Sequence, residues 1–231
     1  MSHATVLLLE EFLQKEQSRP AVDYTAREVY PLTNLQLYFA YVMRGNTTAN
    51  LPFLLKLDPG VDLERLKKAV EDVFDVHPEL KNIIQMGEKG FANFRQDNRR
   101  VEVPVEQLSD AQWEEKRGQL LVPFLYNPGD PLYHTAIYVT ESASYLFFDL
   151  AHIQGDGMTM NLLFEDINAL YAGQKLPAET YTFYEYILDE KDRDARGLRA
   201  ENERYFRELM ENFRIRKSIL NRKDYHDLGT G

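Results

Sequence analysis

The chain has 231 residues, of which 44% are hydrophobic and 28% are charged, so it can bury a sizeable core. Its net charge of −10 argues against a surface that binds nucleic acid or anionic membranes. The absence of cysteine excludes disulfides, cysteine nucleophiles and thiolate metal sites. No apolar run approaches the roughly 18 residues of a membrane span, and no secretory signal pattern is visible at the N-terminus. We therefore expect a soluble, cytoplasmic protein.

The first 30 residues are expected to stand apart from the rest of the chain. Residues 4–17 place apolar side chains at helical spacing and predict an amphipathic helix within a segment 1–18. Residues 19–30 are polar, contain Pro20 and show no period, which is typical of a linker or of an extended crossing segment.

From residue 31 the patterns alternate between helix and strand. Thr33, Asp62 and Ser109 are suitable N-caps, and Ser109 with Gln112 forms a capping-box signature. The helices are expected at 33–43, from 62 to about 74, and at 109–122. The strands are expected at 51–57, 83–86, 91–96, 101–105 and 133–139.

The remainder of the chain is organised around one strand, turn and helix. Tyr145–Ala151 is an apolar run typical of a buried strand, His152–Gly157 is polar and small, and a helix with an apolar face then runs to Tyr171. Further helices are expected at 181–190 and 198–213. Strand pairs and crossovers both occur, which favours an α/β sandwich (α+β) with a mixed sheet flanked by helices.

The turn after the buried strand carries the residues best suited to chemistry. His152 is a candidate general base, because imidazole can accept a proton near neutral pH. Asp156 could hold the turn through backbone amides or pair with a cation, and the amide of Gly157 could donate to a developing oxyanion. Alternatively, His152 and Asp156 simply close a structural turn.

The other histidines carry weaker signals. His77 lies at a helix end, where a cation complements the helix dipole, and His134 lies within a strand pattern and is expected to be structural or on the surface. No two histidines have the spacing of metal ligands, so the sequence does not predict a metal site. The aromatic residues at 181–186 are expected to belong to the core rather than to a ligand site.

The central stretch closely resembles the His-His-x-x-x-Asp-Gly motif of the condensation domains of nonribosomal peptide synthetases. His152, Asp156 and Gly157 match the motif, and Thr159 and an Asp-x-x-x-Leu-Tyr ending (166–171) continue the resemblance. The first motif histidine is replaced by Ala151. On an extended strand this position points away from its neighbour, so the replacement can be tolerated.

Weaker similarities extend upstream, so that the resemblance covers about residues 29–215. Thr33 and Gln36 match the family's first motif, and the segment 76–81 is a degenerate version of its Arg-His-Glu-x-Leu-Arg motif. In that segment His77 and Leu80 match the motif, and Lys81 replaces its final arginine. Segments 123–124 and 131–133 resemble the Pro-Phe-Asp and Pro-Leu-Phe sequences before the motif strand.

The resemblance implies a lobe of the chloramphenicol-acetyltransferase type at residues 31–215, followed at 216–231 by the connection to a second lobe that this chain lacks. Segment 1–18 is expected to be either a plain N-terminal helix or, by the same resemblance, the tail of a preceding carrier protein. The implied reaction is amide-bond formation between a carrier-bound aminoacyl or peptidyl thioester and an acceptor amine. The implied partners are donor and acceptor carrier proteins and an adenylation domain, and phosphopantetheine is carried by those partners rather than bound as a cofactor.

By the same resemblance His152 is the motif histidine that acts as base or positions the amine. Asp156 is structural, with Lys81 as its cationic partner. Without the second lobe and the first motif histidine, the fragment itself is expected to be inactive or nearly so. Two alternatives stay open: an acyltransferase of the same superfamily that uses acyl-coenzyme A, and a non-catalytic platform that binds carrier proteins. Epimerisation is a lesser option, and heterocyclisation is disfavoured because that subtype replaces the histidine kept at 152.

Overall fold

The computed structural model describes residues 23–177, 179 and 181–212. The chain divides into two compact units between Ile187 and Leu188. The helix expected at 4–17, most of the expected linker and the segment 216–231 lie outside the described residues.

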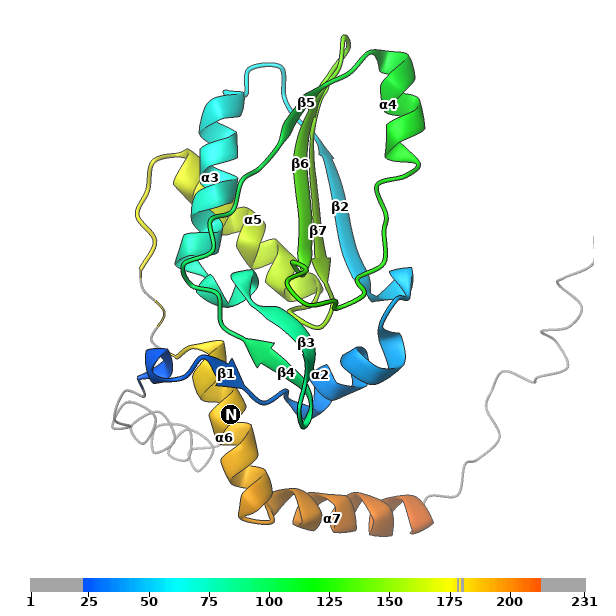
Figure 1. Ribbon diagram of the computed structural model, residues 1–231, viewed down its shortest axis with the longest axis vertical. Helices are drawn as coiled ribbons and strands as arrows, with labels where there is room; N and C mark the ends of the chain where they lie inside the picture. Colours follow the sequence, from blue (N-terminus) through cyan, green and yellow to red (C-terminus); the bar gives the residue numbers. More distant parts are fainter. Residues whose placement is uncertain (1–22, 178, 180, 213–231) are drawn as a thin grey trace, which may run out of the picture. The chain divides into compact units, whose positions relative to one another are not determined.

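A four-stranded mixed sheet forms the centre of the first unit (Figure 1). Its strands lie in the order β2 (Asn50–Lys56), β7 (Ser144–Ala151), β6 (Tyr133–Val139) and β5 (Val105–Gln107). The β2–β7 and β6–β7 pairs are antiparallel, whereas β5 runs parallel to β6. The apolar run that dominated the sequence is therefore an inner strand, with β2 and β6 on its two sides.

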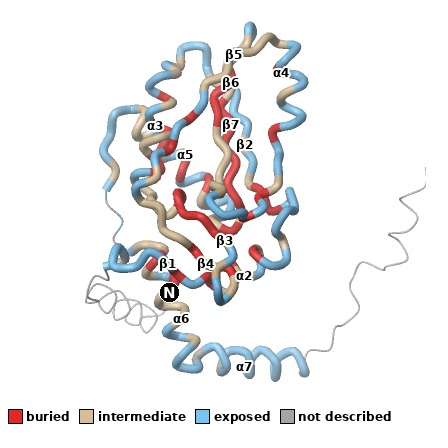
Figure 2. The backbone as a smooth tube through the Cα atoms, in the orientation of Figure 1, coloured by how far each residue is buried: buried red, intermediate tan, exposed pale blue. Residues whose placement is uncertain are grey.

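Helices cover both faces of this sheet, which explains why β7 is apolar without alternation. Helices α3 (Leu63–Val76) and α5 (Gly157–Tyr171) pack on one face, and α4 (Asp110–Arg117) covers the other. Figure 2 shows the buried residues concentrated along the sheet and the inner sides of these helices. The first core contains Val70, Val73, Phe74, Phe148, Leu150, Met160 and Leu163. The second contains Trp113, Ala136, Tyr138 and Phe147.

A second, three-stranded sheet has the order β1 (Val29–Tyr30), β4 (Gly90–Phe94) and β3 (Ile83–Gly87). Its β3–β4 hairpin confirms the prediction for this segment, and Gly90 adopts a positive φ of 112° in the connection. Strand β1 lies at the end of the segment predicted as a linker. Tyr30 in β1 is fully buried and pairs with β4, so the last residues before 31 agree with the alternative of an extended crossing segment rather than with a linker. Two residues are too few to show a period in the sequence.

The helix expected at 33–43 forms but changes its winding. Helix α2 (Asn34–Tyr38) begins at a capping box between Thr33 and Gln36. It continues as a π-helix, η2 (Phe39–Met43). Short 3₁₀ helices occur at η1 (Tyr24–Ala26), η3 (Thr47–Ala49) and η4 (Pro78–Lys81).

Two predicted boundaries differ from the structure. Helix α4 ends at Arg117 rather than at 122, because Gly118 forms its C-cap and the chain then continues without regular structure. The strand expected at 101–105 is β5, which pairs only from Val105 onward. Val101 and Val103 are nevertheless buried. The alternation of apolar and polar residues at 101–105 therefore reflects packing against the core and not pairing in a strand.

After α5, the helix expected at 181–190 is α6 (Phe183–Ala195), and the helix expected at 198–213 is α7 (Leu198–Asn212). Helix α6 spans the boundary between the two units, and in the first unit it buries Tyr184 and Ile187. The predicted α/β architecture, a mixed sheet flanked by helices, is confirmed. Within the described ranges, no helix is long and apolar enough to cross a membrane.

Candidate active site

The turn between β7 and α5 is built around the side chain of Asp156. This residue is the N-cap of α5: its Oδ1 accepts hydrogen bonds from the backbone N–H of Thr159 at 3.0 Å and from the Thr159 hydroxyl at 3.1 Å. The Thr159 Oγ1 accepts the Asp156 N–H at 3.1 Å, which completes a capping box. These hydrogen bonds from Thr159 lower the pKa of Asp156 below its ordinary value. The interpretation of Asp156 as the residue that holds the turn is the one the geometry supports.

His152 is held at the start of the same turn by its backbone and its ring. Its N–H donates to the carbonyl of Ala49 at 2.9 Å. Its imidazole stacks on Phe39, with ring centroids 4.8 Å apart and an interplanar angle of 23°. The Nδ1 atom is buried and has no hydrogen-bond partner among the described residues.

Phe39, which contacts the imidazole, is the first residue of the π-helix η2. A π-helical turn shifts the side chains that follow it relative to an α-helix, and such turns occur frequently at functional sites. Sequence reasoning placed Phe39 among the aromatic residues of a helix but did not connect it with His152. The sequence carries no signal for a π-helical turn at this position.

A cavity of about 270 Å³ lies beside the imidazole. His152 and Asp156 line it on one side. Apolar and aromatic side chains complete its wall, chiefly Leu35, Phe39, Phe183 and Tyr186. Of the aromatic residues at 181–186, which were expected to belong to the core, Tyr184 is buried, whereas Phe183 and Tyr186 line this cavity. An imidazole next to an apolar recess is an arrangement suited to proton transfer on a bound substrate.

Residues from the two weaker motifs also contact this turn. Gln36 Nε2 donates to the carbonyl of Ile153 at 3.1 Å. Gln154 Nε2 donates to the carbonyls of Glu79 and Leu80 at 3.2 and 3.4 Å. The structure thus brings together three segments that are far apart in the sequence, and the turn is braced from two sides. Gln154 was missed, because nothing in its local sequence indicates a contact 75 residues away.

The expected ion pair between Lys81 and Asp156 does not form. Lys81 is buried, and its Nζ donates to Asp75 Oδ1 at 2.9 Å and to the carbonyl of Asp97 at 2.6 Å. The 3₁₀ turn η4 directs the lysine toward the end of α3 and the segment after β4, so the predicted partner was wrong. Asp156 is instead satisfied by the helix that it caps.

Ala151 and the two glycines of the turn differ in how closely other atoms surround them. Ala151 is fully buried in an apolar cluster with Leu132 and Ile153. Gly157 is open, and a Cβ atom added there would meet nothing within 4 Å. A Cβ on Gly155 would lie 2.7–2.9 Å from three side-chain atoms of Thr159, so the close approach is at Gly155. Sequence reasoning singled out only Gly157.

Two histidines outside the turn have carboxylate neighbours. His134 stacks on Phe124 at 4.5 Å, and its Nδ1 lies 3.6 Å from Asp149 Oδ2, which supports the structural role expected for it. Asp149 is fully buried and accepts a hydrogen bond from Asn50 Nδ2 at 2.6 Å.

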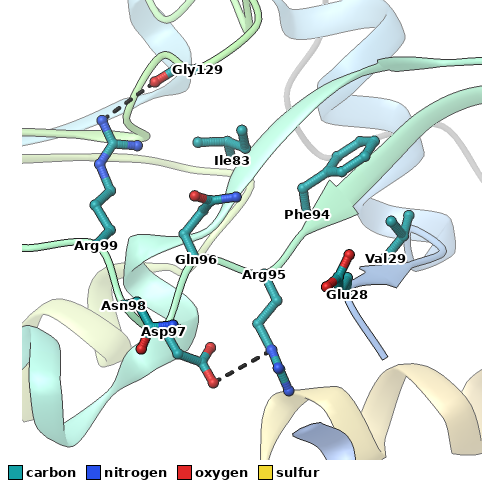
Figure 3. Close-up of a pocket in the computed structure, with 10 residues that line it drawn as sticks. All are labelled: Glu28, Val29, Ile83, Phe94, Arg95, Gln96, Asp97, Asn98, Arg99 and Gly129. Carbon is teal, nitrogen blue, oxygen red and sulfur yellow. Dashed lines mark hydrogen bonds and ion pairs between the residues drawn. The ribbon is translucent and has the colours of Figure 1, made fainter. Parts of the chain in front are cut away.

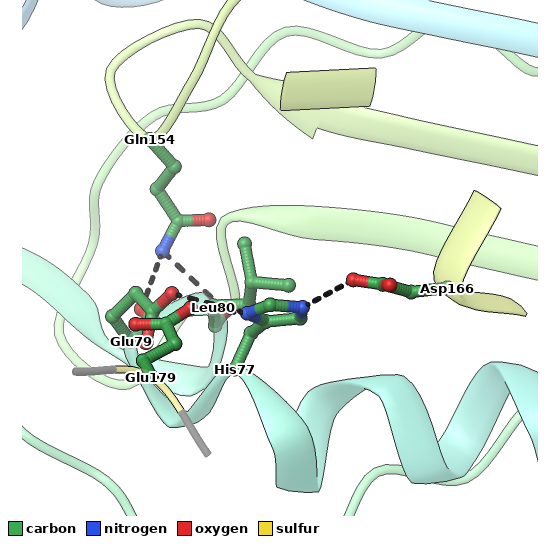
Figure 4. Close-up of polar contacts among 6 residues, drawn as sticks. All are labelled: His77, Glu79, Leu80, Gln154, Asp166 and Glu179. Carbon is green, nitrogen blue, oxygen red and sulfur yellow. Dashed lines mark hydrogen bonds and ion pairs between the residues drawn. The ribbon is translucent and has the colours of Figure 1, made fainter. Parts of the chain in front are cut away.

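His77 does more than complement a helix end (Figure 4). Its Nε2 lies 2.8 Å from Asp166 Oδ2 in α5, and its Nδ1 lies 2.6 Å from Glu179 Oε1. Burial alone would lower the pKa of His77, but the hydrogen bonds to these carboxylates outweigh it and raise the pKa to about 9. Burial, together with the charge of Glu179, raises the pKa of Glu79 to about 7.

A hollow larger than the cavity beside His152 lies elsewhere on the described surface (Figure 3). It measures about 690 Å³ and is lined by residues of β1, β3 and β4 and the segment after β4. Its two arginines have partners: Arg95 Nε lies 3.4 Å from Asp97 Oδ2, and Arg99 donates to the carbonyl of Gly129. His152 is not part of its lining, so volume alone does not identify the candidate active site.

A mixed sheet flanked by helices leads into a His-x-x-x-Asp-Gly turn, and the histidine of this turn lines a cavity. The family model of the Condensation domain matches residues 26–227, and the chain belongs to this family. Among curated proteins it is similar to one of the plipastatin synthase proteins of Bacillus subtilis, with 23% identity over 188 residues. It is also similar to bacitracin synthase 2 of Bacillus licheniformis, with 22% identity over 198 residues.

The solved structures show the same fold. The X-domain in the complex of the X-domain and OxyB from teicoplanin biosynthesis matches with a TM-score of 0.70 at 19% identity, over 88% of this chain and 48% of that one. The condensation domain from the monacolin K polyketide synthase MokA matches with a TM-score of 0.63 at 19% identity, over 77% and 42% of the two chains. The chain thus spans less than half of each of these solved relatives. The match to the plipastatin synthase protein covers 78% of this chain but only 7% of that protein, and the match to bacitracin synthase 2 covers 83% and 8%.

Proposed function

We propose that this chain provides the lobe of a condensation domain that carries the catalytic turn, and that the complete domain forms amide bonds in nonribosomal peptide synthesis. The observation that carries the proposal is the placement of His152: its N–H donates to the carbonyl of Ala49, its ring stacks on Phe39, and it lines a cavity. Because Nδ1 is buried, we take Nε2 as the reacting nitrogen. Family membership supplies the reaction class. The substrates are an aminoacyl or peptidyl thioester and an amine, each on the phosphopantetheine arm of a carrier protein, and an adenylation domain loads the carriers.

In the proposed reaction, the acceptor nitrogen attacks the carbonyl carbon of the thioester. His152 Nε2 takes one proton from that nitrogen as the C–N bond forms. The tetrahedral intermediate then collapses, the C–S bond breaks, and the leaving thiolate takes the proton from the imidazolium. The products are an amide and a free phosphopantetheine thiol. The amide of Gly157, at the first turn of α5, is our candidate donor to the developing oxyanion.

Asp156 and Ala151 have positioning roles in this proposal. Asp156 fixes the start of α5 through Thr159 and does not touch the reacting atoms. Ala151 contributes only packing, because it lies in the apolar cluster behind the strand. We also propose that this lobe alone is inactive or nearly so.

The test is the substitution His152→Ala in the complete synthetase, with dipeptide release measured per folded enzyme. We expect a loss of at least about 100-fold, the contribution typical of a positioned general base. His134→Ala is a matched control, because His134 also stacks on a phenylalanine but does not line the cavity. Equal rates in His152→Ala and the wild type would contradict the proposal.

A second candidate function is a binding platform for other proteins of the assembly line. Two observations favour it: Ala151 replaces the first motif histidine, and a solved relative of the same fold is an X-domain in complex with OxyB. Under this alternative His152→Ala leaves dipeptide release unchanged, whereas substitutions on the carrier-binding surface abolish it. The rate measurement above therefore separates the two candidates.

A further inference from the structure

A cluster of three ligand-type side chains lies outside the candidate active site. His77 Nδ1, a carboxylate oxygen of Glu79 and one of Glu179 all lie within 4.8 Å of one another. His77 Nδ1 is 2.6 Å from Glu179 Oε1 and 3.8 Å from Glu79 Oε1 (Figure 4). The three side chains are only partly exposed, with relative accessibilities of 17%, 19% and 32% for His77, Glu79 and Glu179.

The second nitrogen of His77 has the partner that metal-binding histidines have. Its Nε2 lies 2.8 Å from Asp166 Oδ2 in α5. A histidine that binds a metal almost always gives its other ring N–H to a carboxylate or carbonyl, which fixes the tautomer and turns the free lone pair toward the ion. When Nδ1 gives up its proton and Nε2 keeps its own, the lone pair of Nδ1 points to the side of the ring where Glu79 and Glu179 lie.

The backbone around Glu79 is also held in place. The 3₁₀ turn η4 follows α3 directly, so His77 and Glu79 lie on one tight segment. Gln154 Nε2 donates to the carbonyls of Glu79 and Leu80, which ties this turn to the His152 loop. Two of the three ligand groups therefore come from a rigid element, and Glu179 approaches from the segment before α6.

The charges of the cluster are not balanced by lysine or arginine. Among the described residues, the ion pairs of Glu79 and Glu179 are both with His77. The neighbouring Lys81 is engaged with Asp75 and the carbonyl of Asp97. Three carboxylates, with Asp166, thus surround one imidazole, and a divalent cation would offset this negative charge.

We propose that His77, Glu79 and Glu179 form a binding site for a divalent transition-metal ion of the zinc class, with Asp166 as the group that orients His77. One nitrogen and two carboxylate oxygens are a ligand set that Zn²⁺ accepts, and a set of three leaves a coordination position for water. Binding displaces a proton from Nδ1 of His77. The ion would tie the segment at 179 to the end of α3, and the site is independent of the function proposed for His152.

The experiment is titration of the EDTA-stripped chain with Zn²⁺ by isothermal calorimetry, with Co²⁺ absorbance as a second readout. We expect one ion per chain. Glu179→Gln, which changes an exposed residue, should weaken the affinity at least tenfold. Asp166→Asn should weaken it by about 10–100-fold, the usual effect of losing an orienting carboxylate. A d–d absorption band of bound Co²⁺ should disappear in Glu179→Gln.

The matched control is Asp72→Asn, because Asp72 is also a carboxylate but pairs with Lys68 on the exposed face of α3. It should leave Zn²⁺ affinity unchanged. Circular dichroism of each variant shows whether weaker Zn²⁺ binding comes from a lost ligand or from a loss of folded structure. The proposal is overturned if no ion binds with 1:1 stoichiometry, or if Glu179→Gln and Asp72→Asn bind Zn²⁺ equally well.

Discussion

Two glycines flank the acidic residue that caps α5, and their surroundings differ. A methyl group at Gly155 would collide with Thr159 at 2.7–2.9 Å, whereas one at Gly157 would meet open space. We expect Gly155→Ala to lower the free energy of unfolding by about 1–3 kcal/mol, the usual effect of overpacking. Gly157→Ala should be neutral or stabilising by up to about 1 kcal/mol, because alanine favours the helix. Urea denaturation of both variants measures the difference, and a larger loss in Gly157→Ala would contradict it.

Asp156 stabilises the fold by capping α5, and this contribution depends on its charge. Asp156→Ala should lower the free energy of unfolding by about 1 kcal/mol at neutral pH. The folded-state pKa of Asp156 lies below its ordinary value of 3.8, so this contribution is fully present above pH 3.8. The stabilising contribution of Asp156 is lost as the pH falls through its folded-state pKa.

We therefore expect the stability difference between the wild type and Asp156→Ala to narrow below pH 3.8. Denaturation measured at pH 7 and at successively lower pH values tests this expectation. A difference that stays constant into that range would show that Asp156 acts without its charge.

At the scale of elements, α5 offers two adjacent leucines in opposite environments. Leu163 is 4% exposed in the core, whereas Leu162 is 55% exposed. Leu163→Ala should cost about 2–5 kcal/mol through lost burial and the cavity left behind. Leu162→Ala should change stability by less than about 0.5 kcal/mol, as expected on the surface. Thermal unfolding of the two variants checks both values, and similar shifts would mean that the helix is rotated about its axis.

The elements also show what the sequence can predict. The strand β7 and helix α5 are predictable because one is a long apolar run and the other has a clear helical period. The β3–β4 hairpin and the Thr33 cap depend on local turn and capping chemistry, and both are confirmed. Strand β1 was missed because two residues carry no period, and its existence depends on pairing with β4.

The candidate site is predictable to a smaller extent. His152 and Asp156 were found from their local motif. Their supporting contacts join residues remote in sequence, such as Gln36 with Ile153 at a separation of 117 residues. The contact of His77 with Glu179 spans 102 residues and was likewise not predicted. Lys81 shows the opposite error, since its predicted partner followed the motif while its actual partners depend on the local turn η4.

At the scale of the whole molecule, the four-stranded sheet has an open edge at β2. This strand pairs with β7 on one side, and none of the described strands pairs with its other side. Leu54 and Leu55 on this strand are 43% and 37% exposed. Unprotected edge strands with apolar side chains promote association between chains.

We therefore expect concentration-dependent self-association of the isolated chain, and we expect Leu54→Lys to reduce it. Analytical ultracentrifugation of the two proteins over a range of concentrations measures the effect. Leu125→Lys serves as control, since Leu125 is 49% exposed but lies outside the sheet. Equal reduction by both substitutions would assign the effect to charge rather than to the strand edge.

The pairing of β2 with β7 also affects the order in which the protein folds. The side chains of Asn50 in β2 and Asp149 in β7 are hydrogen-bonded to each other, and the two residues are 99 positions apart in the chain. Contacts of such long range are formed slowly, because a large loop must close before they stabilise anything. Helix α5 can form locally, but the His152 N–H meets the carbonyl of Ala49 only when the two strands have met. On a ribosome, the turn that carries His152 therefore acquires its final geometry only after most of this lobe has been synthesised.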